Sequence, residues 1–361
     1  MGSFWVIIGI IAAVTGILSF LWLIWSILRK KKDRKELKEV IREVIQEEKA
    51  KGTPVYLNGL PEVTKPRKVG LLREAFRAKL EYRHAEAIAK FKECYKLASN
   101  DSERCALLNL IGLSQYTSGA TREAEQSFLT MIRIAERISL KEALSDALIN
   151  IGLVYMRLGK LQESLDFYRK ALEIAKGKSN SKTQALILGN MGLVYQALRN
   201  FQLALKSHSS ALKINEEIGN LRGQASDLGN IGLVRYYQGE PQEALKFHQR
   251  ALSIANQIRD SQLEADNLNN IGNAWKALGD SKKALGHYQR ALEIDEKIGN
   301  KEGQANQLTN IGVVYLDLGQ FKEALSYYQR AREIFVKIGT KDKVEICEGN
   351  IARVKKKLEK Q

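Results

Sequence analysis

Asparagine is the chemical group that this sequence repeats most regularly. Asn150, Asn190, Asn230, Asn270 and Asn310 lie forty residues apart. An amide side chain both donates and accepts hydrogen bonds, so one Asn can satisfy both polar groups of a peptide unit. Asn is also a poorer helix former than Ala, by about 0.6 kcal/mol, so five of them within helices need a reason. Either these amides bind the backbone of an extended peptide, which we favour, or each bonds the neighbouring structural unit.

Residues that perform catalysis in other proteins are few and scattered here. The chain has three Cys and four His, too few for a disulfide framework or a Cys-based zinc site. The sequence contains no phosphate loop, H-E-x-x-H or G-x-S-x-G motif. His208 and His248 occupy positions at which other units carry Tyr, so we interpret both as packing residues. The sequence therefore argues against an enzyme and predicts no cofactor and no metal.

The composition is that of a folded chain with a basic excess. Of 361 residues, 44% are hydrophobic and 27% charged, and 57 Lys+Arg against 41 Asp+Glu give a net charge of +16. The positive charge is spread along the chain, so it is weak evidence for nucleic-acid binding. Helical-repeat RNA readers have shorter periods and basic, stacking faces, whereas the asparagine-bearing face has mixed charge. RNA binding is therefore the weaker alternative.

Residues 4–28 form an uncharged apolar run. A helix of this length extends about 38 Å, which exceeds a hydrocarbon core of roughly 30 Å. Basic residues follow directly, from Arg29 to Lys35, and such residues stay on the cytoplasmic side. The sequence predicts a transmembrane anchor at residues 1–28 and a single-pass membrane protein whose remaining chain is cytoplasmic.

Two further segments precede the repeats. Residues 29–51 place apolar residues at helical spacing among charged ones, which predicts a charged helical stalk. A short dimerising coiled coil is the alternative, but two heptads do not decide it. Residues 52–68 contain Gly52, Pro54, Gly59, Pro61 and Pro66, which is typical of a linker.

From about residue 104 the chain repeats every forty residues. Each unit carries Asn, then Ile or Met, then Gly, and in most units an aromatic residue three positions after the Gly. Gly159, Gly239 and Gly319 are placed to end a first helix, and Arg199-Asn200 replaces the glycine in one unit. Each unit therefore predicts a helical hairpin that must stack on its neighbours to bury its apolar sides.

These positions resemble the tetratricopeptide repeat, and the forty-residue period is similar to the variant in kinesin light chains and Pins-type proteins. The resemblance covers residues 104–340, and residues 69–98 are similar to a divergent first unit. It implies an all-α, right-handed superhelical solenoid of about seven hairpins at residues 69–340. A capping helix at about 341–359 is expected within the C-terminal segment 341–361.

The resemblance also implies that the first helices line a concave groove. The residues expected to bind a peptide there share the face of Asn150; they are Asn150, Asn190, Asn230, Asn270, Asn310, Arg157, Leu193, Leu233, Tyr237 and Asn273. The expected function is a membrane-anchored scaffold or adaptor for a protein or peptide partner. A regulatory protein that senses a peptide or another ligand is the alternative. The mixed signs of Asp146, Arg157, Asp266, Lys276 and Asp317 do not set the ligand's charge, and the oligomeric state stays open.

Overall fold

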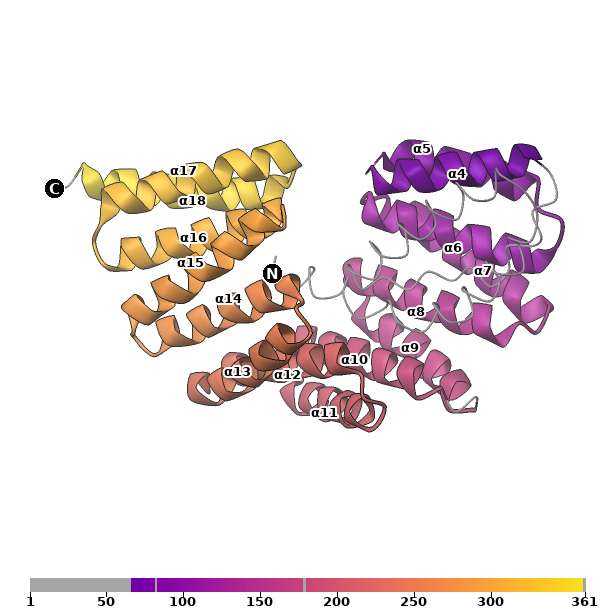
Figure 1. Cartoon of the computed structure of the whole chain (residues 1–361), viewed down its shortest axis with the longest axis horizontal. Coiled ribbons are helices and arrows are strands. Elements are labelled where there is room, and N and C mark those ends of the chain that lie inside the picture. Colours follow the sequence, from indigo (N-terminus) through magenta and orange to yellow (C-terminus); the bar gives the residue numbers. More distant parts are fainter. Residues whose placement is uncertain (1–65, 82, 178–179, 360–361) are drawn as a thin grey trace. The chain divides into compact units, whose positions relative to one another are not determined.

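The computed structural model describes residues 66–81, 83–177 and 180–359, and fifteen helices and no strand occupy these residues (Figure 1). The helices are α4 (Pro66–Leu80), α5 (His84–Lys96), α6 (Asp101–Thr117), α7 (Thr121–Arg137), α8 (Lys141–Arg157), α9 (Leu161–Gly177), α10 (Ser181–Ala197), α11 (Phe201–Glu217), α12 (Leu221–Tyr237), α13 (Pro241–Gln257), α14 (Ser261–Ala277), α15 (Ser281–Lys297), α16 (Lys301–Asp317), α17 (Phe321–Ile338) and α18 (Lys341–Leu358). The predicted all-α repeat architecture is confirmed for this part of the chain. The first described helix, α4, begins at Pro66, within the predicted linker.

The predicted localisation is wrong. Among the described residues, no helix is long and apolar enough to cross a membrane. The described helices are 13 to 18 residues long and carry charged side chains, whereas a membrane span needs about 20 mainly apolar residues. The expected anchor at residues 1–28 and stalk at 29–51 lie outside the described residues.

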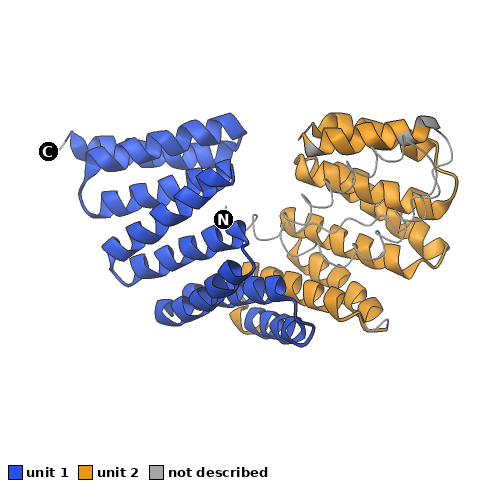
Figure 2. Ribbon diagram, in the orientation of Figure 1, with its two compact units in different colours: residues 1–4, 204–361 blue, residues 5–203 orange. Residues whose placement is uncertain are grey.

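The described helices belong to two compact units, which Figure 2 shows in different colours. The N-terminal unit ends at Leu203 and contains α4 to α10. The C-terminal unit begins at Ala204 and contains α12 to α18, while the boundary falls within α11. In both units each helix contacts the next one along the chain, and the first helices of adjacent hairpins also touch.

Within each hairpin, a glycine of the first helix lies against a ring of the second. A Cβ on Gly152 would come within 2.6 Å of the Tyr168 ring, and one on Gly272 equally close to the Tyr288 ring. Both rings are fully buried. The same contact recurs between Gly112 and Phe128, Gly232 and His248, and Gly312 and Tyr328. The glycine of each Asn-Ile-Gly triplet is thus required because no larger residue fits beside the ring.

The hairpin turns use a left-handed residue, which favours glycine because it lacks a Cβ. Gly159 and Gly319 have φ values of 75° and 74°. In the unit without this glycine, Arg199 takes the left-handed conformation with φ of 57°. Asn200 instead accepts a hydrogen bond from the Leu203 amide at 3.2 Å. Asn200 therefore caps the start of α11, and Arg199 carries the backbone strain.

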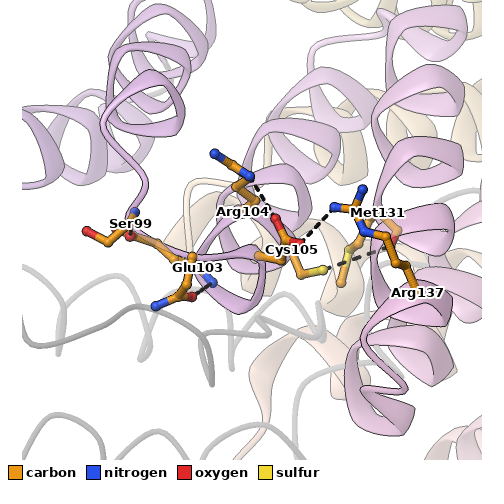
Figure 3. Close-up of polar contacts among 8 residues, drawn as sticks. Ser99, Glu103, Arg104, Cys105, Met131 and Arg137 are labelled. Atoms are coloured by element: carbon orange, nitrogen blue, oxygen red, sulfur yellow. Dashed lines mark hydrogen bonds and ion pairs between the residues drawn. The ribbon is translucent and has the colours of Figure 1, made fainter.

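The start of α6 is fixed by a group of charged and polar side chains (Figure 3). Asn100 accepts a hydrogen bond from the Glu103 amide at 2.9 Å, and the Glu103 carboxylate accepts one from the Ser99 amide. Glu103 is fully buried and forms an ion pair with Lys68 of α4. These contacts cap the start of α6, and the ion pair joins the first described hairpin to the second.

Candidate peptide-binding face

The asparagines lie in the middle of the first helices of successive hairpins. The N-terminal unit carries Asn150 on α8 and Asn190 on α10, and the C-terminal unit carries Asn230, Asn270 and Asn310 on α12, α14 and α16. Residues four before and three or seven after each Asn share its side of the helix. We call this side of the first helices the asparagine face.

Two of the asparagines bond the neighbouring hairpin. The Asn150 Nδ2 donates to Asn109 Oδ1 at 2.8 Å, and the Asn310 Nδ2 donates to Asn269 Oδ1 at 2.8 Å. In each pair the acceptor lies 41 residues earlier, on the first helix of the preceding hairpin. Asn150 and Asn310 thus make the hydrogen bonds that are expected if the asparagines bond the neighbouring structural unit.

Asn190 differs because the residue 41 positions earlier is Ile149, whose side chain has no hydrogen-bonding group. Asn190 is 1% exposed, and neither its Nδ2 nor its Oδ1 has a partner among the described residues. A buried amide without a partner loses its hydrogen bonds to water and gains none in exchange. Asn190 therefore has unused capacity for one donor and one acceptor.

The C-terminal unit contains a related pair. Gly229 stands 41 residues before Asn270 and offers it no side chain. The Oδ1 of Asn270 accepts only a long hydrogen bond, 3.4 Å, from Asn269 Nδ2. Asn230 is 1% exposed, and its Nδ2 has no partner in the described part of the chain. Both amides thus keep hydrogen-bonding capacity that the fold does not use fully.

The other residues expected on this face have different surroundings. The Arg157 guanidinium lies 3.6 Å from the centroid of the Tyr116 ring and donates to the Tyr116 carbonyl. Asn273 accepts a hydrogen bond from the Tyr288 hydroxyl at 2.7 Å. Both side chains are thus engaged in the fold. The remaining three differ in exposure: Leu193 is buried, Leu233 is half-buried and Tyr237 is 52% exposed.

Sequence reasoning noted Asp146 and Asp266 on this face but not their electrostatic state. Burial raises the pKa of each carboxyl to about 7. Repulsion from Glu142 adds to the increase at Asp146, and repulsion from Asp295 adds to it at Asp266. Their position four residues before Asn150 and Asn270 could be seen in the sequence. The raised pKa could not, because desolvation depends on the folded packing.

Two buried polar junctions between hairpins were missed. In one, Asn215 Nδ2 donates to Asp227 Oδ2 at 2.8 Å. In the other, Asp295 accepts from Asn300 at 2.7 Å and from Gln307 at 3.3 Å. Glycines in the next helix make room: a Cβ on Gly223 or Gly303 would lie within 2.5 Å of the Asn215 or Asp295 side chain. In the sequence, a glycine in the first turn of a helix was the feature that could have indicated these junctions.

Comparison with known proteins agrees with this architecture. A family model for the tetratricopeptide repeat matches residues 143–217, 183–257, 224–297 and 261–337. These overlapping matches together span more than half of the 361 residues. A search of curated proteins finds no match.

Solved structures with a similar fold include apo RapI, with 15% identity, a TM-score of 0.62 and coverage of 76% of this chain and 99% of that one. A Rap protein complexed with Competence and Sporulation Factor has 13% identity, a TM-score of 0.57 and coverage of 91% and 98%. A signal-transduction ATPase with a tetratricopeptide repeat sensor, from Pyrococcus horikoshii, has 16% identity, a TM-score of 0.59 and coverage of 93% and 53%. Such identities show the fold alone. With the family match, they lead to one assignment: the chain belongs to the tetratricopeptide repeat family.

Proposed function

We propose that this protein is an interaction scaffold that binds an extended peptide segment of a partner on the asparagine face. Asn190 carries the argument, because its amide is 1% exposed and both of its polar atoms lack partners among the described residues. One peptide unit of a bound segment offers a carbonyl to Nδ2 and an N–H to Oδ1. Binding would thus satisfy a buried group that the fold leaves unsatisfied.

Under this proposal the five asparagines have two different roles. Asn150 and Asn310 hold adjacent hairpins together through Asn109 and Asn269. Asn190 in the N-terminal unit, and Asn230 and Asn270 in the C-terminal unit, each bind peptide backbone within their own unit. Leu193 and Leu233 flank these amides, and the exposed ring of Tyr237 offers an apolar contact.

Membership of the tetratricopeptide repeat family supports an interaction role, since such repeats typically mediate contacts between proteins. A regulatory role, in which peptide binding is a signal, is the second candidate. It is supported by the similarity in fold to a Rap protein that is complexed with Competence and Sporulation Factor.

The test uses the full chain and an immobilised library of random eight-residue peptides. Peptides retained by the wild type should be released when Asn190, Asn230 and Asn270 are all changed to Ala, with about a tenfold loss of affinity for each backbone contact removed. Asn256→Ala is the matched control, because it removes an exposed amide from α13. Helix content from circular dichroism checks that each variant is folded. Unchanged retention by the triple variant would contradict the proposal.

A further inference from the structure

Asp146 and Asp266 occupy the same position in their repeats, on α8 in the N-terminal unit and on α14 in the C-terminal unit. Each lies one helical turn before an asparagine, so each shares the asparagine face with Asn150 or Asn270. Both residues are half-buried. Among the described residues, neither carboxylate forms an ion pair with a Lys, Arg or His.

The surroundings of Asp266 are acidic and leave it uncompensated. Its Oδ1 accepts from Gln262 Nε2 at 3.1 Å, while its buried Oδ2 has no partner in the described chain. The charged groups that act on it are Asp295 and Asp260, and both raise its pKa. Arg222 of α12 is paired with Asp260 at 3.0 Å. A buried carboxylate without a counter-ion is stabilised by any cation that reaches it.

At the positions equivalent to Asp266, the neighbouring described helices α12 and α16 carry a hydroxyl and an amide and no cationic side chain. The equivalent position on α12 is Ser226, and on α16 it is Asn306, which accepts from Lys343 Nζ at 2.8 Å. One turn further along α12, the buried Asn230 has an Nδ2 without a partner. This amide is an independent sign of a missing ligand, because it concerns a different helix and a neutral group.

Asp146, in the N-terminal unit, also lies near a carboxylate of the same sign. Glu142, one turn earlier on α8, is the charged residue that acts on Asp146, and it has the same sign. The neighbouring first helix places Leu186 at the equivalent position and the unpartnered Asn190 one turn later. An apolar residue, a free amide and an uncompensated carboxylate thus lie on adjoining helices.

We propose that the peptide segments recognised on the asparagine face carry Lys or Arg side chains, and that Asp146 in the N-terminal unit and Asp266 in the C-terminal unit each select such a segment within their own unit by pairing with one of these cations. This inference rests on the proposed function and adds the chemistry of the partner: a basic segment in an extended conformation. Within each unit, Asn side chains hold the backbone of the segment, and the carboxylate pairs with its cation. A charge-assisted hydrogen bond in a partly desolvated site is about twice as strong as a neutral one, so charge should dominate the selection.

The probe is three immobilised sets of eight-residue peptides, random except for one central residue, which is Lys, norleucine or Glu. The full chain should be retained on the Lys set at least about tenfold more strongly than on the norleucine set, and least on the Glu set. The double variant D146N/D266N should lose this preference and bind the norleucine set as the wild type does. The change from carboxylate to amide is nearly isosteric, and circular dichroism verifies folding.

Asp317→Asn is the matched control, since Asp317 lies on the same face but is exposed and paired with Lys276 at 3.6 Å. It removes the same charge and should leave the Lys preference intact. Equal retention on the Lys and norleucine sets, or a Lys preference that survives in D146N/D266N, would overturn the inference while leaving peptide binding in place. Retention of none of the sets, or retention that does not depend on Asn190, overturns the proposed function itself, and the inference falls with it.

Discussion

Two asparagines at equivalent positions, Asn150 and Asn190, should respond in opposite ways to the same substitution. Asn150→Ala removes the 2.8 Å hydrogen bond to Asn109 between α6 and α8. Asn190→Ala removes an amide that has no partner in the described structure. Both side chains are 1% exposed, so differences in burial do not complicate the comparison.

The magnitudes follow from the two environments. Each Ala gains about 0.6 kcal/mol of helix propensity. At Asn150 this gain is outweighed by about 1 to 2 kcal/mol for the lost interhelical bond and its buried acceptor. At Asn190 no bond is lost, and the desolvation penalty of the unpaired amide, about 1 kcal/mol or more, is relieved. The free energies of unfolding of the two variants should therefore differ by about 2 to 3 kcal/mol.

Urea titration of the full-length variants, followed by circular dichroism at 222 nm, measures this difference if the denaturant slope stays constant. The midpoint of Asn190→Ala should exceed that of the wild type, and the midpoint of Asn150→Ala should fall. Asn256→Ala on α13 reports the effect of propensity alone at an exposed site. Equal destabilisation at positions 150 and 190 would refute the conclusion that Asn150 holds hairpins together while Asn190 is available to a peptide.

Three further outcomes follow from strain and buried charge. Arg199→Gly should raise the free energy of unfolding by about 1 kcal/mol in a urea titration, because the left-handed conformation at φ 57° strains any residue with a Cβ. Burial lowers the pKa of His248 to about 4, so its contribution to stability is present above pH 6.5 and is lost as the pH falls from 6.5 to 4. His248→Phe should therefore gain up to about 3 kcal/mol relative to the wild type at pH 4, measured by urea titrations at several pH values. Burial raises the pKa of Asp295 to about 6, so its contribution is present below pH 4 and is lost as the pH rises to 6. Asp295→Asn removes this titrating carboxyl and should make the melting temperature less dependent on pH between 4 and 7. The new amide can donate to Gln307, whose Oε1 has no partner among the described residues. An unchanged pH profile would contradict this.

Much of the fold could be predicted because the forty-residue period repeats the local signals of a hairpin. The helix ends at Gly159 and Gly319 and the start of α18 at Lys341 all follow from it. The left-handed role of Arg199 could not be predicted, because propensity favours its neighbour Asn200. The membrane localisation was inferred from the apolar run at residues 4–28, and the described helices do not support it.

The site was less predictable because its chemistry depends on contacts between repeats. Asn150 and Asn190 look identical in the sequence. Their difference lies 41 residues earlier, at Asn109 and Ile149, because Asn109 accepts a hydrogen bond from Asn150 and Ile149 has no side-chain group that could accept one from Asn190. The raised pKa of Asp266 likewise depends on packing around α14. The repeat pattern therefore identified the asparagine face, but only the packing of the repeats distinguishes one residue of that face from another.

The pairing rule between neighbouring first helices has an evolutionary consequence. The residue 41 positions earlier decides whether a given asparagine is hydrogen-bonded within the stack. Asn109 and Asn269 accept such a bond, whereas Ile149 and Gly229 have no side-chain acceptor, so one codon can change the outcome. Repeats of one common sequence can thus diverge into cohesive and receptive copies without any change of length or hairpin geometry. A tandem array built by duplication can in this way shift its recognition positions along the chain, one substitution at a time.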